Sequence, residues 1–222
     1  MKFTLLRRPR LRLSLAPLLA SLLVACVAAP PVRFHSLLPL DAPERDATAG
    51  AGFVVTLAPV SVPSQVDQPQ WLLRAGDGTL MRLEQERWAS PLRSELRAAL
   101  LDRWLSRWGA AESLPAPHAG SASAASAATP AAVTGWRVVV DVTRFESLPG
   151  REVRLDSRWS ARSGQVGVSS VNCRSLIRES VGEGTLALAD GHRRAVTRLA
   201  DDMARHLAAL QRGESPACVP AG

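Results

Sequence analysis

The chain of 222 residues contains no tyrosine and one lysine, Lys2, so arginine supplies nearly all of its permanent positive charge. Lys and Arg together number 27 against 20 Asp and Glu, which gives a formal net charge of +7. Five of these basic residues fall within residues 1–25, so the remainder carries 22 basic and 20 acidic groups, a net of +2. So small an excess gives no basis for nucleic-acid binding, because that function needs a clustered positive surface.

Motifs of the common enzyme and metal-site classes are also missing. The sequence has no HExxH, no Cys/His pair at metal-ligand spacing and no Gly-x-Ser-x-Gly turn. Its four histidines are scattered; we expect His206 to pack beside an apolar helix face and His192 to lie on a solvated face. The charged segments 84–87 and 193–194 are interpreted as solvated surface. These absences predict a protein that is not an enzyme and holds no metal or dissociable cofactor.

Long apolar runs are scarce, and the one that stands out is Leu13–Ala25. It follows a basic stretch without acidic residues and has the length of a signal-peptide core, too short to span a bilayer comfortably as a helix. It ends in Leu23-Val24-Ala25-Cys26, where small residues suit a peptidase groove and the thiol of Cys26 can accept a diacylglyceryl group. We therefore predict a lipoprotein signal peptide at residues 1–25. The alternative is an ordinary secretory signal followed by a chance cysteine.

Lipid on Cys26 would be the only non-protein group of the mature chain, as a covalent diacylglycerol and an N-acyl chain. A single acyl chain binds membranes only reversibly, and this set of chains meets the requirement for stable anchoring. With Cys26 acylated, Cys173 and Cys218 remain as an even pair in an oxidising compartment. Our hypothesis is a disulfide that ties the C-terminal tail to the strand holding Cys173. The alternative is a buried thiol at Cys173 and a loose one at Cys218.

The rest of the chain is organised as one domain with an insertion. Residues 26–33 are rich in proline and small side chains and resemble a lipidated tether. Residues 34–212 form the domain, and residues 213–222 form a tail without periodicity. Within the domain, residues 113–134 consist mostly of Ala, Ser, Pro and Gly, and are interpreted as an inserted surface loop.

Hydrophobic periodicity predicts strands and two helices inside this domain. Ser90 is expected to cap the first helix with Pro91 at its first position, and Gly109 to end it. An apolar stripe with a spacing of four supports that helix, and a second stripe supports a helix over Arg193–Leu210. Strands are expected at Phe34–Leu38, Phe53–Val62, Trp71–Arg74, Thr79–Leu83, Trp136–Phe145, Val153–Arg162 and Val171–Val181.

This order predicts an α+β fold: a single two-layer domain in which a mostly antiparallel β-sheet carries two amphipathic helices on one face. The Gly-Asp-Gly tip at residues 76–78 supplies residues that tolerate positive φ, as a tight hairpin requires. Alternation along Val153–Arg162 is typical of a strand with one buried and one wet face.

Two short segments carry a resemblance to a known family. Val66-Asp67-Gln68-Pro69-Gln70, Arg74 and Arg87-Trp88-Ala89-Ser90-Pro91-Leu92 stand in the order and spacing seen in the ABC-type transport auxiliary lipoproteins. The likeness extends over essentially the whole mature chain except residues 113–134. The sequence departs from the family pattern at Gln68, where arginine is usual, and at Ser90, where glutamate is usual.

The resemblance implies a non-catalytic docking subunit in lipid traffic across the periplasm. It implies an MCE-domain protein of the PqiB type as partner, indirect contact with inner-membrane transport components, and a homo-oligomeric ring. Val27 follows Cys26 where an aspartate would favour the inner membrane, so the family rule implies the periplasmic face of the outer membrane. Two other classes remain open: a lipid-binding periplasmic chaperone and an outer-membrane assembly lipoprotein.

The partner surface is expected along extended residues 62–74. Prolines frame this segment, and we expect it to expose unpaired backbone together with the apolar side chain of Trp71. The alternative is a strand that simply pairs inside the sheet. The residues predicted to bind the partner are Asp67, Pro69, Trp71, Arg74 and Trp88.

Overall fold

The computed structural model describes residues 30–40, 52–113, 135–164 and 170–218. The chain divides into two compact units, residues 1–31 and 32–222, and every described helix and strand belongs to the second. The predicted signal peptide, the lipidation site Cys26, and residues 114–134 of the predicted insertion lie outside the described residues. Within those residues, no helix combines the length and apolar character needed to cross a membrane.

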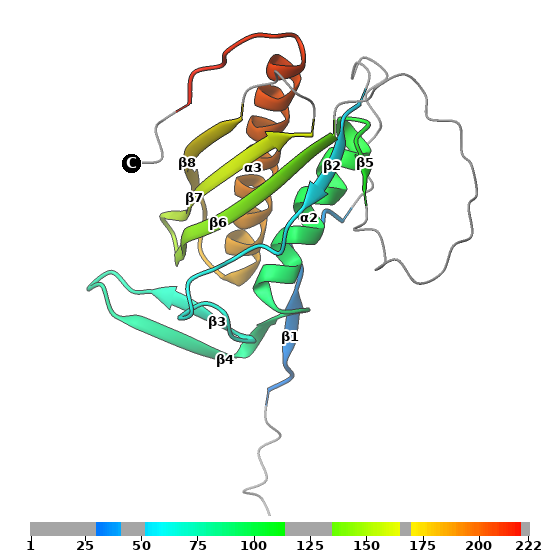
Figure 1. Ribbon diagram of the computed structural model, residues 1–222. Helices are drawn as coiled ribbons and strands as arrows, with labels where there is room; N and C mark the ends of the chain where they lie inside the picture. The colour runs from blue at the N-terminus through cyan, green and yellow to red at the C-terminus, as the bar shows by residue number, and fades with distance from the viewer. Residues whose placement is uncertain (1–29, 41–51, 114–134, 165–169, 219–222) are drawn as a thin grey trace, which may run out of the picture. The chain divides into compact units, whose positions relative to one another are not determined.

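The described residues form eight strands and two helices, which Figure 1 labels in chain order. Their bounds are β1 Arg33–His35, β2 Val54–Leu57, β3 Gln70–Arg74, β4 Leu80–Trp88, α2 Leu92–Arg107, β5 Ala111–Glu112, β6 Gly135–Leu148, β7 Glu152–Ser163, β8 Val171–Ser180 and α3 Thr185–Gln211.

The predicted α+β class is confirmed, but the strands form two mixed sheets in place of one mostly antiparallel sheet. Five strands run in the order β5-β2-β6-β7-β8, where β6, β7 and β8 form the predicted antiparallel meander. β2 pairs in parallel with both β5 and β6, because the chain crosses over through the β3–β4 hairpin and α2 before it returns. The second sheet has the order β1-β4-β3, with β1 parallel to β4.

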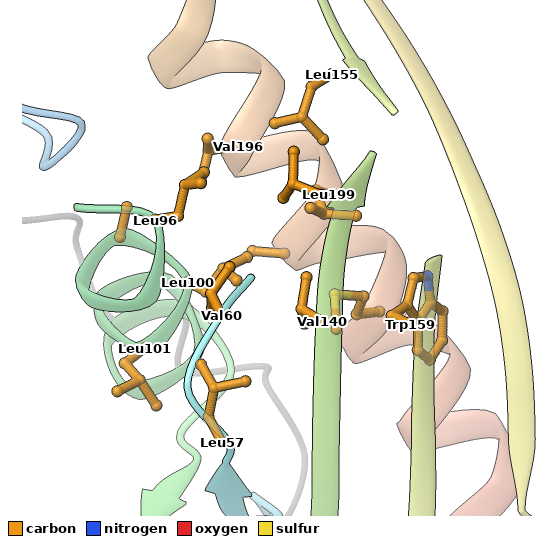
Figure 2. Close-up of a cluster of buried hydrophobic side chains, with 14 of the residues drawn as sticks. Leu57, Val60, Leu96, Leu100, Leu101, Val140, Leu155, Trp159, Val196 and Leu199 are labelled. Carbon is orange, nitrogen blue, oxygen red and sulfur yellow. The ribbon is translucent and has the colours of Figure 1, made fainter. Parts of the chain in front are cut away.

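Both helices cover one face of the five-stranded sheet (Figure 1). The predicted stripes face inward: Leu96 and Leu100 of α2 and Val196 and Leu199 of α3 are buried against the sheet (Figure 2). The helices also bond to each other, because Trp104 Nε1 donates to the carbonyl oxygen of Ala200 at 2.9 Å. Only residues 89–91 separate the end of β4 from the start of α2.

The start of α2 differs from the prediction. Pro91 occupies the N-cap position, and no side chain caps the helix. The prediction that Ser90 is the cap was wrong: its hydroxyl donates to the Glu95 carboxylate at 2.7 Å and accepts no bond from a helix N–H. The same carboxylate accepts bonds from the Ser36 hydroxyl and the Leu37 N–H, so Glu95 joins the chain after β1 to the helix. The helix ends as predicted, before Gly109 at a φ of 60°.

α3 begins at Thr185, about two turns before the predicted start at Arg193. The added turns are buried along the line of the predicted stripe, with Leu188 and His192 inside the core. The expectation that His192 lies on a solvated face was therefore wrong: its side chain is 0% exposed. Burial lowers the pKa of His192 to about 3, so the ring is neutral at ordinary pH.

Candidate functional site

The two segments that carry the family resemblance lie side by side in the structure. A tight turn over residues 63–67, with the Val66 N–H donating to the Pro63 carbonyl oxygen at 3.0 Å, brings the chain back toward β4. The N–H of Trp88 then donates to the carbonyl oxygen of Pro69 at 3.0 Å. On the other side, the N–H of Ala89 donates to the carbonyl oxygen of His35 at 2.8 Å. These backbone bonds hold three separate stretches of sequence around one surface depression.

That depression, called here the β4–α2 groove, has a volume of about 330 Å³. Its open side is marked by Phe34, whose side chain is 64% exposed although it is a large aromatic ring. The exposed ring thus adds apolar surface to the groove. The groove is lined by Phe34, Asp67, Gln68, Pro69, Arg87, Trp88, Ala89, Ser90, Pro91 and Arg93.

The charges of the groove are only partly compensated. Arg93 pairs with Asp67 at 3.2 Å, and the Arg93 side chain is largely exposed. Arg87 has a buried Nε without a hydrogen-bond acceptor among the described residues. A buried donor left without an acceptor costs about 1–3 kcal/mol.

A buried cluster of charged and polar side chains packs next to the residues that line the groove. Glu86 is buried, accepts a hydrogen bond from Nε2 of His35 at 2.6 Å and pairs with Arg33. Burial alone would raise the pKa of Glu86, but the hydrogen bonds from His35 and Arg33 and their charges outweigh burial and lower it. The interpretation of residues 84–87 as solvated surface therefore holds for Glu84 and was wrong for Glu86. This cluster fixes β1, and with it Phe34, against β4.

The structure separates the five predicted partner-binding residues into two groups. Asp67, Pro69 and Trp88 line the groove, whereas Trp71 and Arg74 do not. The expectation of an exposed Trp71 was wrong: its side chain is 2% exposed, and its Nε1 donates to the Ser147 hydroxyl at 2.8 Å. Trp88 is 4% exposed and packs against Trp71 with ring centroids 4.5 Å apart. The two tryptophans thus pack together in the core, and Trp71 offers no surface to a partner.

Arg74 is engaged within the molecule. Its guanidinium bonds to the Glu146 carboxylate at 2.7 Å and to the carbonyl oxygen of Gly78 at 3.0 Å, which ties the hairpin to β6. β3 is an edge strand of its sheet, so one side of its backbone has no neighbouring strand, as the prediction requires. The apolar side chain expected beside it, that of Trp71, is buried in the core. The groove residues that are absent from the predicted partner-binding set are Phe34, Gln68, Arg87, Ala89, Ser90, Pro91 and Arg93.

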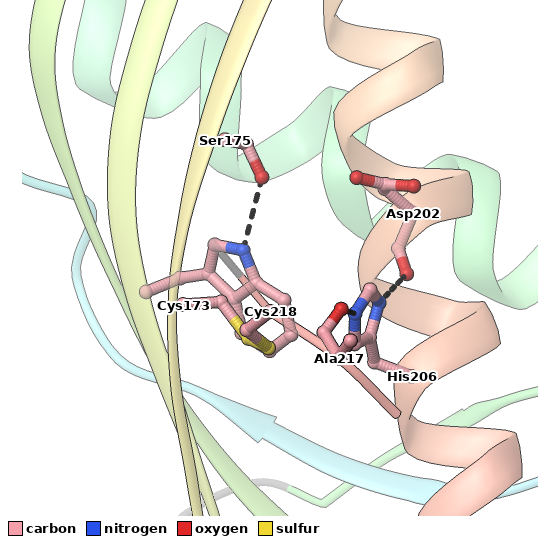
Figure 3. The surroundings of a disulfide bond; sticks show 7 residues. Cys173, Ser175, Asp202, His206, Ala217 and Cys218 are labelled. Carbon is pink, nitrogen blue, oxygen red and sulfur yellow. Dashed lines mark hydrogen bonds between the residues drawn. A yellow bond between two sulfur atoms is a disulfide. The ribbon is translucent and has the colours of Figure 1, made fainter. Parts of the chain in front are cut away.

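Cys173 and Cys218 form a second cluster near the start of β8. The structure joins them in a disulfide with a Cα–Cα separation of 5.1 Å (Figure 3). His206 of α3 lies beside this bond, with Nδ1 2.7 Å from the carbonyl oxygen of Asp202. Its ring also meets Trp159 edge-on at 5.5 Å, as expected for a packing role. The disulfide holds residues 213–218 of the tail against the sheet.

One Ser–His pair has the spacing of a nucleophile and its base. Ser147 Oγ lies 2.8 Å from Nε2 of His192. Both side chains are buried, at 1% and 0% exposed, and Ser147 already binds Trp71, so a substrate has no access to the hydroxyl. The arrangement therefore acts as part of the core and gives no support to hydrolysis.

Comparisons with known proteins agree with this picture. The family model for the ABC-type transport auxiliary lipoprotein component matches residues 35–204. A protein from Xanthomonas campestris of the DUF330 family has a similar structure, with a TM-score of 0.55 and 15% identity, over 82% of this chain and 98% of that one. The structure of an uncharacterized protein gives a TM-score of 0.56 at 15% identity, over 80% of this chain and 99% of that one. The search of curated proteins gives no match.

The two structural likenesses show the shared fold, and the family match covers most of the sequence, including both segments that frame the β4–α2 groove. This chain belongs to the family of ABC-type transport auxiliary lipoprotein components.

Proposed function

We propose that this chain is an outer-membrane lipoprotein that acts as a non-catalytic docking subunit of an MCE-type, ABC-linked lipid transport system. The observation that carries the proposal is the β4–α2 groove, where the two motif segments of the family meet around an exposed aromatic ring. The groove binds the partner, an MCE-domain protein of the PqiB type, and the lipid on Cys26 keeps the groove close to the membrane.

The length of the tether supports this arrangement. Phe34 lies eight residues after Cys26. A fully extended chain spans at most about 3.6 Å per residue, so the groove lies within roughly 30 Å of the lipidated cysteine. A periplasmic protein that reaches the outer membrane therefore meets the groove within that distance of the lipid anchor.

The chemistry of the groove favours a protein segment as occupant. Phe34, Pro69 and Pro91 provide apolar walls, and the largely exposed guanidinium of Arg93 provides hydrogen-bond donors. A volume of about 330 Å³ lies at the small end of ligand pockets, which suits a short apolar segment better than a two-chain lipid. Aromatic and arginine side chains are also the residue types that dominate binding energy at protein interfaces.

Capture of the MCE-domain partner by the full-length protein tests the proposal. Phe34→Ala should reduce capture at least about tenfold, since a central aromatic anchor contributes about 2 kcal/mol or more. Leu186→Ala is the matched control, because Leu186 is also a large exposed apolar residue but lies on α3. Equal capture by wild type, Phe34→Ala and Leu186→Ala would contradict docking at the groove. Ring formation by this chain remains a prediction, which native mass spectrometry of the detergent-solubilised protein tests.

A further inference from the structure

Cys173, Cys218 and His206 bring three metal-ligand atoms together at the end of α3. The two sulfurs and a ring nitrogen of His206 lie within 4.8 Å of one another. Each comes from a different element: Cys173 from β8, His206 from α3, and Cys218 from the tail. The sequence spacing does not predict this cluster, because 45 residues separate the cysteines and the histidine lies between them.

We propose that reduction of the Cys173–Cys218 disulfide converts this cluster into a zinc site. In the oxidised protein the two sulfurs bind each other, and in the reduced protein their thiolates and the imidazole of His206 bind one Zn²⁺. A Cys₂His set leaves the fourth tetrahedral position of zinc open to water. Soft thiolates with an imidazole select zinc over magnesium or calcium.

The ring of His206 is oriented as a metal ligand would be. A neutral imidazole has one N–H, and the bond of 2.7 Å between Nδ1 and the Asp202 carbonyl oxygen assigns that hydrogen to Nδ1. Nε2 then carries the lone pair of the ring, and it faces the tail that holds Cys218, 3.3 Å from the carbonyl oxygen of Ala217. An Nδ1–H bound to a backbone carbonyl is the usual arrangement of a metal-ligating histidine, because it fixes the tautomer and aims Nε2 at the metal.

The two cysteines differ in their freedom to move. Cys173 is buried in β8, where it pairs with Trp159 of β7. Cys218 belongs to residues 214–218, which have neither helix nor strand, and it is only partly buried. Two thiolates on one zinc stand apart by roughly 3.8 Å, given Zn–S bonds of about 2.3 Å in a tetrahedron. The tail can supply this separation, while Cys173 and His206 keep their places in the core.

The chemical balance of the conversion is simple. A dithiol reductant transfers two electrons and two protons to the disulfide, which gives two protein thiols and the oxidised, disulfide form of the reductant. Zn²⁺ then replaces the two thiol protons, which pass to water, and the neutral Nε2 of His206 binds without losing a proton. The partial exposure of Cys218 and His206 gives the ion a route of entry.

The test uses the full-length protein in detergent, with Co²⁺ as a spectroscopic substitute for Zn²⁺. The reduced protein should bind one Co²⁺ with thiolate charge-transfer absorption that Zn²⁺ abolishes, and the oxidised protein should show none. Cys218→Ser should lose the charge-transfer band of the two-thiolate site. His206→Ala should weaken binding by more than the roughly 10- to 100-fold that loss of an outer-shell partner costs.

Asp202→Asn serves as the matched control. This substitution removes an exposed carboxylate one turn from His206 but leaves the backbone carbonyl oxygen that binds Nδ1, so metal affinity should stay unchanged. Absence of Co²⁺ binding by the reduced protein would overturn the proposal. Binding that persists equally in Cys218→Ser and His206→Ala would also overturn it, because the metal would then lie elsewhere. Neither result depends on the docking partner.

Discussion

The hydroxyl of Ser147 lies 2.8 Å from Nε2 of His192 and accepts a bond of the same length from Nε1 of Trp71. These three residues belong to β6, α3 and β3, so one buried oxygen joins the five-stranded sheet, the long helix and the three-stranded sheet. Trp71 in turn packs under Trp88, whose backbone helps to frame the β4–α2 groove. The groove therefore rests on a hydrogen-bonded junction in the core.

Ser147→Ala should lower the free energy of unfolding by about 1–3 kcal/mol, because it leaves the buried N–H of Trp71 without an acceptor. Urea denaturation of the full-length protein measures this loss. Ser160→Ala on the partly exposed side of β7 is the control and should stay within about 0.5 kcal/mol of wild type. A loss for Ser147→Ala no larger than that of the control would contradict the role given to the hydroxyl.

The burial of His192 predicts a specific dependence of stability on pH. The folded pKa of about 3 lies below the ordinary histidine value of 6.5, so between these values the unfolded state binds the proton and the folded state does not. The stability that the neutral ring permits is complete above pH 6.5 and is lost as the pH falls toward 3. Over that window this one group contributes a slope of about 1.4 kcal/mol per pH unit. The free energy of unfolding, measured at several pH values, reports the slope.

His192→Gln should remove this part of the slope whatever it does to stability at neutral pH, since glutamine does not titrate. The partly exposed His206 provides the comparison, and His206→Gln should leave the slope in place. Identical pH profiles for wild type and His192→Gln would show that the ring has the same pKa in the folded and unfolded states and would contradict its burial as a neutral group.

Gly191 allows α3 to approach the strands closely. A Cβ at this position would overlap with Cγ1 of Val181 and lie 3.3 Å from both Cγ atoms of Val153. Helix propensity alone predicts that Gly191→Ala stabilises the protein by roughly 0.5–1 kcal/mol. The crowding predicts the opposite sign, a loss of about 1–3 kcal/mol. Gly182→Ala, with its nearest neighbour at 3.9 Å, should be tolerated in the same thermal or urea melts.

The disulfide predicts both a thiol count and a stability change. Unfolded, unreduced protein should show no thiol reactive toward a colorimetric reagent, since Cys26 is acylated and Cys173 is bonded to Cys218. Two reactive thiols would contradict the bridge. Cys218→Ser should lower the free energy of unfolding by about 2–4 kcal/mol, because the bridge closes a loop across 45 residues of sequence.

Local periodicity was enough to predict much of the fold. The alternation along β6 and β7 placed Val138, Val140, Leu155 and Trp159 on buried faces, and the structure confirms this. The Gly-Asp-Gly hairpin and the end of α2 before Gly109 are also confirmed. Each of these features depends on neighbouring residues alone. The parallel pairing of β2 with β6 could not be predicted in this way, because it joins Val54 to Gly135 across a long stretch of chain.

The errors about single residues have a common physical cause. Glu86 and His192 have polar atoms that suggest solvent, and Trp71 was expected to be exposed because prolines frame its segment. Each is buried, and a partner from a distant segment satisfies its polar atoms. Two of the three carried a usable signal. Glu86 lies two residues before Trp88 on the same face of β4, and His192 lies four residues before Val196 on the line of the apolar stripe. Phe34 carried no such signal, because its exposure beside the groove depends on how β1 pairs with β4.

Membrane anchoring through Cys26 is the claim on which the docking proposal most depends, and one labelling experiment tests it. Cells that express the full-length protein are given labelled palmitate, and their membranes are separated by density. The proposal predicts that wild type carries the label and sediments with the outer membrane, whereas Cys26→Ser takes up no label and leaves that fraction. Wild type without label, or Cys26→Ser that still sediments with the outer membrane, would contradict it.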